Sequence, residues 1–590
     1  MKHFSKIALM CICLLITAMF TTACGGGGKA TPPSYPYFPI NNQANNNQQE
    51  NNNANNNENN NNNQEQEENN NQEEQGTSVE VTLTLIDSLN SENIAKADIF
   101  YSIEDNNKKT SADDKEILQA EPQTDDKTKF TVTATGTDDP ANIKIKAIIT
   151  YDSTGKYIDY FSSYNGIEGT NGNFDINFEN SQDNEQGFGG DGTGTEEKPF
   201  IISQPRHFIN INKKDEQGKY LYLDKSFKQT ADLDFTHLTG LKINKAEEDK
   251  DITIDVKNEK APLYNDGKGI DPIGNYNLGT ESQEELLNGI FQGIYDGDNH
   301  IIDGIVMANS EKVSIGLFSI IYNGTIQKLI IGENSIFFID ETNKHENTYI
   351  GTISGFSLGY EATTKIEQCE NRAKILLSKV EFSSDYDYCF LNISGISIDP
   401  SGQVTIKKCK NTGSITIDSC QLKATTIPTF YIRNFYSEKA SENTNEGHIN
   451  ITNNKSLDNN GELNIQNRSD KFTNTGNITV DNNTNLGNIH LYINALNSAN
   501  TMNDSTNDGY ITITNNKLDN NNNNNYLGAL DFYADSFSNC VNNGNIVINN
   551  NSNYRIGLAK NILSENDATG CTNTGTVTVD GVEGEIYNNN

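Results

Sequence analysis

One seven-residue phrase returns along the C-terminal half of the chain, and it limits the fold more than any other feature. The phrase reads Asn-x-Gly-x-apolar-x-apolar and begins at Asn411, Asn445, Asn474, Asn507, Asn542 and Asn573. Successive copies begin 34, 29, 33, 35 and 31 residues apart. A period of this length, which varies by only a few residues between copies, indicates a repeat architecture. Because apolar and polar residues alternate within each copy, the repeat is typical of a strand and predicts stacked coils.

Simple physical chemistry explains why such a unit stacks. Residues two apart lie on one face of a strand, so both apolar positions of each copy point inward. One coil alone buries too few aliphatic side chains to offset its backbone entropy. We expect the glycine to occupy a turn with positive φ. We expect the asparagine before it to cap that turn and to pair, amide to amide, with the next coil.

Two further copies of the phrase fall between the main copies. They are NNGELNI from Asn459 and NLGNIHL from Asn485. Their offset from the main period predicts that they are second strands of the same repeating unit.

The first residues form a targeting segment. Two early lysines precede an apolar run, residues 7–20, that has the length of a signal peptide and is short for a membrane span. The small residues that follow resemble a bacterial lipobox, in which a signal peptide of residues 1–23 precedes a lipidated Cys24. Thr21 departs from that pattern, because leucine is usual there, and an ordinary secretory signal is the alternative. The residue after Cys24 is Gly25, whereas an aspartate at that position resembles an inner-membrane retention signal. The outer membrane or the cell surface is therefore favoured as the location.

Composition divides the rest of the chain into four segments. Residues 24–76 are dominated by Asn, Gln and Glu, which bury too little apolar surface to fold, and we expect a disordered tether. Residues 77–180 contain six short alternating runs, typical of an immunoglobulin-like β-sandwich that serves as a stalk. Residues 181–194 are rich in Gly, Asp and Asn and are predicted to be a linker. Residues 195–590 are interpreted as one solenoid.

Charge and composition bear on the choice of partner. Lys and Arg number 44 against 80 Asp and Glu, a net charge of -36, which argues against nucleic acid because nucleic-acid binding needs clustered basic residues. Trp is absent, whereas 25 tyrosines keep aromatic contacts with sugars available. The abundance of Asn and Ile is also what an AT-rich genome produces.

Six thiols remain after the signal peptide and the anchor. They are Cys369, Cys389, Cys409, Cys420, Cys540 and Cys571. Four of them stand two residues before a repeat asparagine, which predicts one inward-pointing residue per coil at that place. An exported protein can form disulfides, but neighbouring coils lie about 4.8 Å apart whereas bridged Cβ atoms prefer about 3.8 Å. A ladder of buried free thiols is therefore favoured over bridges.

Three acidic or histidine patterns resemble parts of functional motifs. The DGDNH segment from Asp296 lacks the remaining oxygen ligands of a calcium loop, so we predict a turn. Asp232 and Asp234 share a strand face, and glycoside hydrolysis requires such a pair, but a strand that opens the first coil is the favoured interpretation. His345 and Glu346 lack the second histidine of a zinc-peptidase motif. We predict no catalytic residue, metal ligand or cofactor.

Part of the solenoid resembles a known surface motif. The segments GLFSIIYNGTIQKLII from Gly316, IGTISGF from Ile350 and IEQCENRAKI from Ile366 are similar to the bacterial GLUG motif, and the resemblance covers residues 194–417. Proteins with this motif are surface-exposed or secreted and are similar to right-handed parallel β-helices. Some of them carry zinc peptidases, an activity that does not transfer to a chain without the HExxH motif.

The resemblance and the layout imply an all-β surface lipoprotein without enzymatic activity. Its expected fold is a right-handed parallel β-helix preceded by the β-sandwich and the tether. Its expected partners are the membrane, through the lipid anchor, and a host glycoprotein, matrix or glycan ligand. A polysaccharide-degrading enzyme and a passive surface element are the alternatives. The basic cluster of a lyase is not evident, because the arginines are scattered along the repeat at Arg206, Arg372, Arg433, Arg468 and Arg555.

Overall fold

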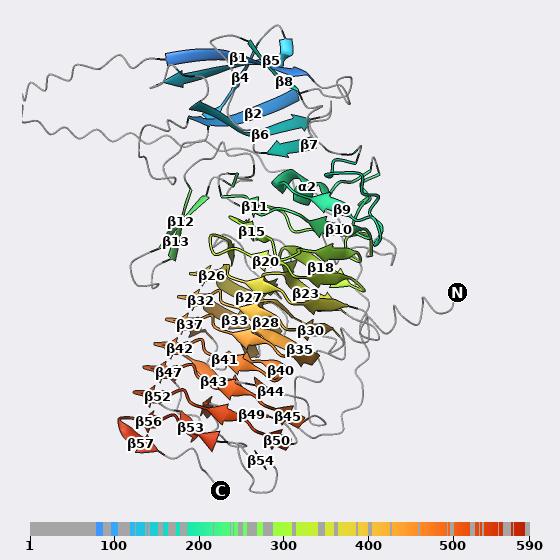
Figure 1. Ribbon diagram of the computed structural model, residues 1–590. Helices are drawn as coiled ribbons and strands as arrows, with labels where there is room; N and C mark the ends of the chain where they lie inside the picture. Colours follow the sequence, from blue (N-terminus) through green and yellow to red (C-terminus); the bar gives the residue numbers. More distant parts are fainter. Residues whose placement is uncertain are drawn as a thin grey trace, which may run out of the picture. The chain divides into compact units, whose positions relative to one another are not determined.

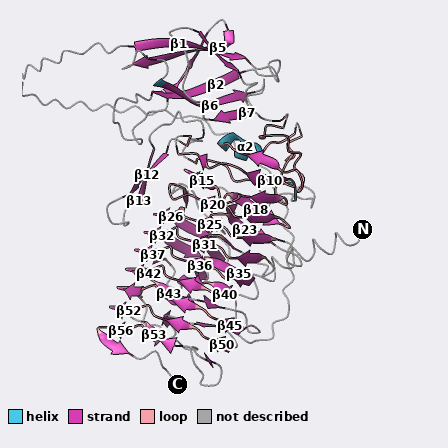
Figure 2. Cartoon of the chain, viewed as in Figure 1, coloured by secondary structure: helices cyan, strands magenta, loops and turns pink. Residues whose placement is uncertain are grey.

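The computed structural model describes residues 78–584, apart from gaps of which the longest cover residues 87–95, 104–117, 163–172, 275–286 and 559–567. The signal peptide, the lipidation site Cys24 and the tether therefore lie outside the described residues. Strands account for nearly all of the regular structure (Figure 1, Figure 2).

The first described domain consists of two four-stranded sheets, with strand orders β4-β5-β1-β8 and β3-β2-β6-β7. Only the β1–β8 pair is parallel among the paired strands described there. Val81, Leu83 and Phe130 are buried. The hydroxyl of Tyr101 in one sheet donates to the carbonyl of Thr133 in the other at 3.2 Å. The six expected strands are present, and β3 and β4 are additional. The strands are β1 (Ser78–Ile86), β2 (Lys96–Ile103), β3 (Leu118–Gln119), β4 (Glu121–Gln123), β5 (Asp126–Thr135), β6 (Ile143–Tyr151), β7 (Tyr157–Ser162) and β8 (Asn173–Asn177).

The C-terminal part of the chain is a parallel β-helix, which confirms the predicted fold class. Successive turns of the chain add strands to four sheets, which we number sheets 1 to 4 in the order in which the chain visits them (Figure 1). They contain eleven, ten, ten and eight strands. Pairing within them is parallel, except that β57 runs antiparallel to β56 at the end of sheet 3. Sheet 2 thus has ten rungs, somewhat fewer than the dozen that chain length suggests.

The strand bounds follow the sheets. Sheet 1 contains β9 (Phe200–Ile202), β10 (Ser226–Gln229), β14 (Ile294–Asp296), β18 (Phe318–Tyr322), β19 (Thr325–Gln327), β23 (Ser354–Leu358), β24 (Lys365–Glu367), β29 (Ser397–Ile398), β30 (Thr405–Lys407), β35 (Phe435–Ser441) and β40 (Arg468–Asp470). Sheet 2 contains β11 (Leu233–Asp234), β15 (Ile301–Asp303), β20 (Ile330–Ile331), β25 (Glu370–Asn371), β31 (Lys410–Asn411), β36 (Thr444–Asn445), β41 (Thr473–Asn474), β46 (Thr506–Asn507), β51 (Val541–Asn542) and β55 (Thr572–Asn573). Sheet 3 contains β16 (Val306–Ala308), β21 (Ile336–Ile339), β26 (Lys374–Ser378), β32 (Ile415–Asp418), β37 (Ile449–Thr452), β42 (Ile478–Asp481), β47 (Ile511–Thr514), β52 (Ile546–Asn549), β56 (Val577–Val579) and β57 (Val582–Gly584). Sheet 4 contains β17 (Ser314–Ile315), β22 (Thr348–Gly351), β28 (Tyr388–Ser394), β34 (Ile427–Ile432), β39 (Gly461–Gln466), β43 (Leu486–Tyr492), β48 (Tyr526–Ala529) and β53 (Arg555–Leu558).

Shorter sheets accompany these four. They contain β12 (Leu241–Lys245) with β13 (Ile252–Val256); β27 (Glu381–Ser384) with β33 (Gln421–Ala424) and β38 (Lys455–Ser456); β44 (Asn494–Ala495) with β49 (Phe532–Tyr533); and β45 (Thr501–Asn503) with β50 (Ser536–Ser538) and β54 (Ala568–Thr569).

Each main copy of the repeat phrase supplies one strand to sheet 2 and one to sheet 3. The two intermediate copies lie elsewhere: Gly461 begins β39 and Leu486 begins β43, both in sheet 4. The prediction that they are second strands of the same unit is confirmed.

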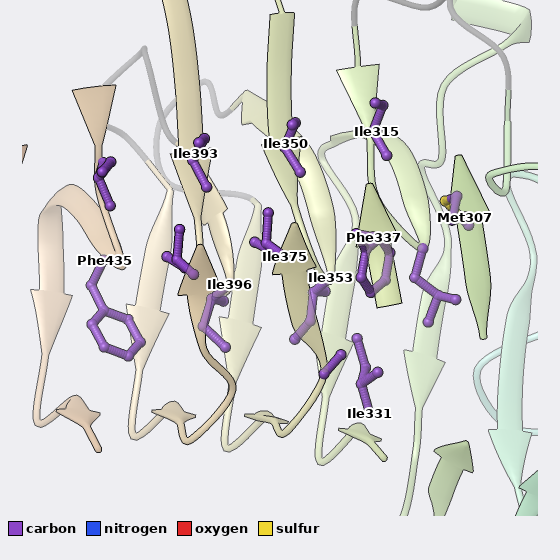
Figure 3. Packing of buried hydrophobic residues seen from close by; sticks show 14 of the residues in the cluster. Met307, Ile315, Ile331, Phe337, Ile350, Ile353, Ile375, Ile393, Ile396 and Phe435 are labelled. Carbon is purple, nitrogen blue, oxygen red and sulfur yellow. The ribbon is translucent and has the colours of Figure 1, made fainter. Parts of the chain in front are cut away.

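Aliphatic side chains in register fill the interior of the solenoid. In sheet 3 the inward positions align as Ile375, Ile415, Ile449, Ile478, Ile511, Ile546 and Val577, all of them buried. Figure 3 shows the same alignment in sheet 4, where Ile315, Ile350 and Ile393 stand side by side on adjacent strands. The outward residues that alternate with them in sheet 3 from β32 to β56 are only partly buried, whereas the outward Leu376 of β26 is buried. This alternation is the period-two pattern that the sequence predicts.

Aromatic side chains replace aliphatic ones in the first coils. Helix α2 (Pro205–Asn210) begins with Pro205 at a position where its fixed φ is favourable. The helix places Phe208 with its ring centroid 5.9 Å from Tyr295 and 6.4 Å from Phe318. Because these rings are large, the short helix α2 is enough to cover the apolar interior of the solenoid at its first coils.

The expected linker, residues 181–194, is packed over its second half. Phe188 is buried and stacks on Phe200, with 4.5 Å between ring centroids. The amide of Gly189 donates to the carbonyl of Ile201 at 3.0 Å. These contacts place residues 188 and 189 within the first coil, so the ordered solenoid begins before residue 195.

The repeat asparagines form a buried column in sheet 2. From Asn371 through Asn411, Asn445, Asn474 and Asn507 to Asn542, each Nδ2 donates to the Oδ1 of the next asparagine at 2.7–2.8 Å. Each Nδ2 also donates to the carbonyl two residues ahead, at 3.0–3.3 Å. The predicted cap and the predicted amide pairing are both confirmed.

The repeat glycines have a different role from the one expected. None of Gly413, Gly447, Gly476, Gly509, Gly544 and Gly575 has positive φ. A Cβ at each of them would overlap with a backbone carbonyl of the previous rung; at Gly509 that carbonyl belongs to Gly476. The prediction of a positive-φ turn was wrong, because the glycine is required by the close approach of two backbones.

Positive φ is found instead at two corners of each coil, mostly without glycine. One corner contains Lys328, Gln368, Lys408, Glu442, Lys471, Asp504 and Asn539, and the other contains Lys379, Ser419, Asn453, Asn482, Asn515, Asn550 and Asp580. The second corner precedes another buried column that the sequence analysis did not predict. In it, the buried Asn454, Asn483 and Asn516 and the half-buried Asn551 are linked by amide hydrogen bonds of 2.9–3.0 Å.

Removal of one amide from the sheet 2 column should weaken the solenoid. Asn474→Ala leaves the Asn445 Nδ2 donor and the Asn507 Oδ1 acceptor without their partner. We expect the free energy of unfolding to fall by about 2–4 kcal/mol, measured by urea titration. The neighbouring Thr475 is exposed, and Thr475→Ala should change it by less than about 0.5 kcal/mol. Equal effects of the two variants would contradict the structural importance of the column.

A methyl group in the glycine column should separate two rungs. Gly509→Ala places Cβ against the Gly476 carbonyl, which belongs to rigid backbone. The expected loss is about 3 kcal/mol, the upper part of the range for overpacked interiors. Gly581 has a φ of 77° and open space around it, so Gly581→Ala isolates the cost of positive φ, about 1 kcal/mol. A thermal shift for Gly509→Ala no larger than that for Gly581→Ala would disprove the close-approach argument.

Candidate functional site

The DGDNH segment joins β14 to β15 as a turn, as predicted. Asp298 and Asn299 have φ values of 47° and 67°. The Lys228 ammonium lies 3.1 Å from the Asp298 carboxylate, and this hydrogen bond holds the pKa of the carboxyl below its usual value. Asp296 accepts hydrogen bonds from the Asp298 amide at 3.0 Å and from Gln327 Nε2 at 3.0 Å. The acidic side chains of this segment therefore stabilise the coil.

Asp232 and Asp234 are both exposed and flank the buried Leu233, as residues on one strand face do. Asp232 accepts from the Ile301 amide at 2.8 Å, and Asp234 accepts from the Thr236 amide at 2.9 Å. Each carboxylate thus binds a backbone amide of its own loop or of the next coil. The strand interpretation is confirmed, since Leu233 and Asp234 form β11.

The described residues contain no group of three or more His, Cys, Asp or Glu side chains arranged to hold a metal ion. Within the same part of the chain, no helix has the length and apolar character needed to cross a bilayer. His345 and Glu346 lie outside the described residues.

The predicted free-thiol ladder is confirmed where the structure describes it. Cys369, Cys409, Cys420 and Cys540 are buried and form no disulfide. Burial raises the pKa of Cys369 well above its usual value, and the adjacent Cys409 adds to this shift. Burial likewise raises the pKa of Cys420 to about 12. Cys571 and the side chain of Cys389 lie outside the described residues.

These pKa shifts predict low thiol reactivity. Because the thiolate is the nucleophile, Cys369 and Cys420 should resist alkylation at pH 8 in the folded protein and react after unfolding in urea. Site-resolved mass spectrometry after iodoacetamide treatment provides the measurement. Rapid labelling of Cys420 in the folded protein, without loss of structure, would show that the site is accessible and its pKa ordinary.

Polar side chains gather on the outer face of sheet 4. Arg433 donates through Nη1 to Asn392 Oδ1 at 3.2 Å, and its guanidinium lies 4.3 Å from the ring centroid of Tyr431. Farther along this face, burial lowers the pKa of His490, and the nearby Glu462 acts in the opposite direction. Sequence spacing did not reveal this cluster, because its members come from different rungs with different local sequences.

A second surface, which we call the repeat face, extends over three successive rungs. It consists of the outward side chains of the strand pairs β41–β42, β46–β47 and β51–β52 and of the residues that join the two strands of each pair. Outward and inward residues alternate there without interruption from residue 473 to 481, 506 to 514 and 541 to 549, and the outward ones are half-buried or exposed. Most are Thr, Asn or Asp, and these three stretches contain no Lys or Arg.

Hydrogen bonds between rungs fix several of these side chains. Thr514 Oγ1 donates to Asp481 Oδ1 at 2.5 Å, and Asn543 Nδ2 donates to Asp508 Oδ1 at 2.8 Å. The amide of Tyr510 donates to Asn477 Oδ1 at 3.0 Å. The face is therefore a preorganised polar surface that repeats from rung to rung.

One aromatic ring projects from the repeat face. Tyr510 is 55% exposed, and the other large apolar side chains exposed in the described chain, Leu221 and Leu457, are each 40% exposed and lie elsewhere. The residue precedes β47 and lies between Asn477 and Asn545 of the neighbouring rungs. The sequence pattern placed it outward, but it did not single out this tyrosine among 25.

Comparison of the chain with protein-family models, with curated proteins and with solved structures finds no match. The GLUG resemblance stays a prediction.

Proposed function

We propose that this chain is a lipid-anchored surface protein that displays its β-helix for adhesion to ligands of a host or of neighbouring cells. The observation that carries the proposal is the repeat face, on which most outward positions of three successive rungs in register hold Thr, Asn or Asp. Such a surface makes many similar contacts with an extended ligand, and linked weak contacts add up to firm attachment. Adhesion needs this kind of multivalent contact and no reactive group.

The N-terminal sequence supports display at the cell surface. Cys24 in its lipobox-like context supplies the anchor, and acyl chains add about 0.8 kcal/mol of membrane affinity per buried methylene. The Asn, Gln and Glu-rich segment that follows provides a polar spacer between the anchor and the first strand. Together they would hold the solenoid away from the membrane, where its outer faces meet solvent.

A polysaccharide-cleaving enzyme is the second candidate. The observation that favours it is the cluster on sheet 4, where Arg433, Tyr431 and His490 share an outer face with Glu462. General acid–base cleavage needs such groups within reach of one sugar linkage. Glycoside hydrolysis requires a pair of carboxyl groups; Asp232 and Asp234 are exposed, and one oxygen of each accepts a hydrogen bond from a backbone amide.

Adhesion can be measured with the full chain purified in detergent. We expect saturable binding to at least one surface among immobilised mucin, fibronectin, collagen and fixed epithelial cells, because the repeat face provides many contacts at once. Bound polysaccharide should remain uncleaved, with no new reducing ends.

A Cys24→Ser variant provides the control for the anchor. It should lose its association with membranes and keep its binding to the immobilised ligand. Absence of binding on every surface would exclude adhesion and leave a passive surface role, whereas release of reducing ends would support the enzyme.

A further inference from the structure

We infer that the ligand of the repeat face is an uncharged polysaccharide chain, which lies across successive rungs with one sugar ring stacked on Tyr510. This inference rests on the proposed adhesive function and narrows it to one ligand class and one face.

The first argument is the match between the periods of protein and ligand. Strands that pair in a sheet are about 4.8 Å apart, which is close to the length of one sugar ring in an extended chain. The register Thr479–Thr512–Val547 places two threonine hydroxyls at this interval along sheet 3, followed by an apolar valine on the third rung. A linear polymer of similar units can therefore make with Thr512 the same contact that it makes with Thr479 on the neighbouring rung.

The second argument is the chemistry of the side chains. Thr479 and Thr512 are half-buried outward residues, and in the described structure no protein group is hydrogen-bonded to their hydroxyls. Threonine has a stiff χ1, so little rotamer entropy is lost when its hydroxyl binds a partner. Sugar hydroxyls both donate and accept hydrogen bonds, as threonine hydroxyls and asparagine amides do.

The third argument is the position of the aromatic ring. Tyr510 is the one exposed aromatic ring on the repeat face, whose other outward residues are polar except for the half-buried Val541 and Val547; Asn477 and Asn545 lie beside it on the neighbouring rungs. A single ring among hydroxyls and amides is too small for the apolar centre of a protein interface. It suits the apolar face of one sugar ring, with hydrogen-bonding groups available to the sugar's edges.

The fourth argument is charge. The three stretches of the repeat face contain Asp481 and Asp508 but no Lys or Arg. Within these stretches an acidic polysaccharide or a phosphate-rich ligand would meet carboxylates and no cation, and the exposed Lys471 lies at the edge, two residues before Thr473. The repeat face therefore discriminates against polyanions and favours a neutral chain.

The test uses the full chain in detergent and surfaces coated with dextran, mannan, galactan, laminarin or heparin. We expect retention on at least one of the four neutral polymers and none on heparin. Tyr510→Ala should weaken that binding about three- to tenfold, the range for loss of one aromatic contact. Because Tyr510 is exposed, the thermal midpoint should not change.

A second variant and a matched control separate the face from the fold. Thr479→Val with Thr512→Val keeps the side-chain shape and removes two hydroxyls, so it should weaken binding while the solenoid stays folded. Leu221→Ala, which also removes an exposed apolar side chain but lies outside the repeat face, should bind as the wild type does.

The outcomes distinguish this inference from the proposed function. Binding to fibronectin, collagen or cells without binding to any neutral polymer would overturn the inference and leave adhesion standing. Binding of Tyr510→Ala and of the double valine variant at wild-type strength would show that the ligand occupies another face. Retention on heparin alone would overturn the charge argument, and failure to bind any surface would exclude both proposals.

Discussion

The contact between each repeat glycine and the backbone of the previous rung determines the geometry of the whole solenoid. At Gly447, Gly476 and Gly509 the carbonyl of the preceding rung lies where a Cβ would be. This approach leaves the flanking asparagine amides 2.7 Å apart, as between Asn474 and Asn507. A slip of one residue would put a side chain into the glycine position and turn every isoleucine outward. The glycine column and the amide column thus select one register.

The same geometry accounts for the strained corners. Lys408, Ser419 and Asn453 have φ values between 54° and 58°, a conformation that costs a non-glycine residue about 1–2 kcal/mol. Each corner amide donates to a carbonyl of the following rung, at 3.1, 3.0 and 3.1 Å. A regular strand would end at that place with its amide unpaired, which is also costly when the group is buried. The strain is therefore offset by a hydrogen bond that only the stacked state provides.

The sequence predicted the parts of the fold that follow from local periodicity. The alternation of Ile415 and Ile417 with polar residues identified the inward face, and the recurrence of asparagine identified the amide column. It did not locate the corners, because residues as different as Lys408 and Glu442 occupy one of them. Consecutive asparagines such as Asn453 and Asn454 were a signal for the second column, which we attributed to base composition.

The candidate site was predictable only in outline. That the repeat face points outward follows from period two, but the exposure of Tyr510 depends on the small neighbours that adjacent rungs place beside it. The cluster of Arg433 and Tyr431 with Asn392 depends on the pairing of β28 with β34, which are joined by a long connection. Contacts of this kind are set by register between distant segments, and a single sequence does not contain that register explicitly.

The amide column has a consequence for how such a chain changes in evolution. Each asparagine donates through Nδ2 to the asparagine of the following rung and accepts through Oδ1 from that of the previous rung. The hydrogen-bond pattern of the column is therefore unchanged when a whole repeat is gained or lost. A partial repeat would interrupt both the amide pairing and the glycine contact. Recombination between copies therefore yields folded proteins in discrete lengths, and the extent of the outer surface can vary between descendants without any change to its local chemistry.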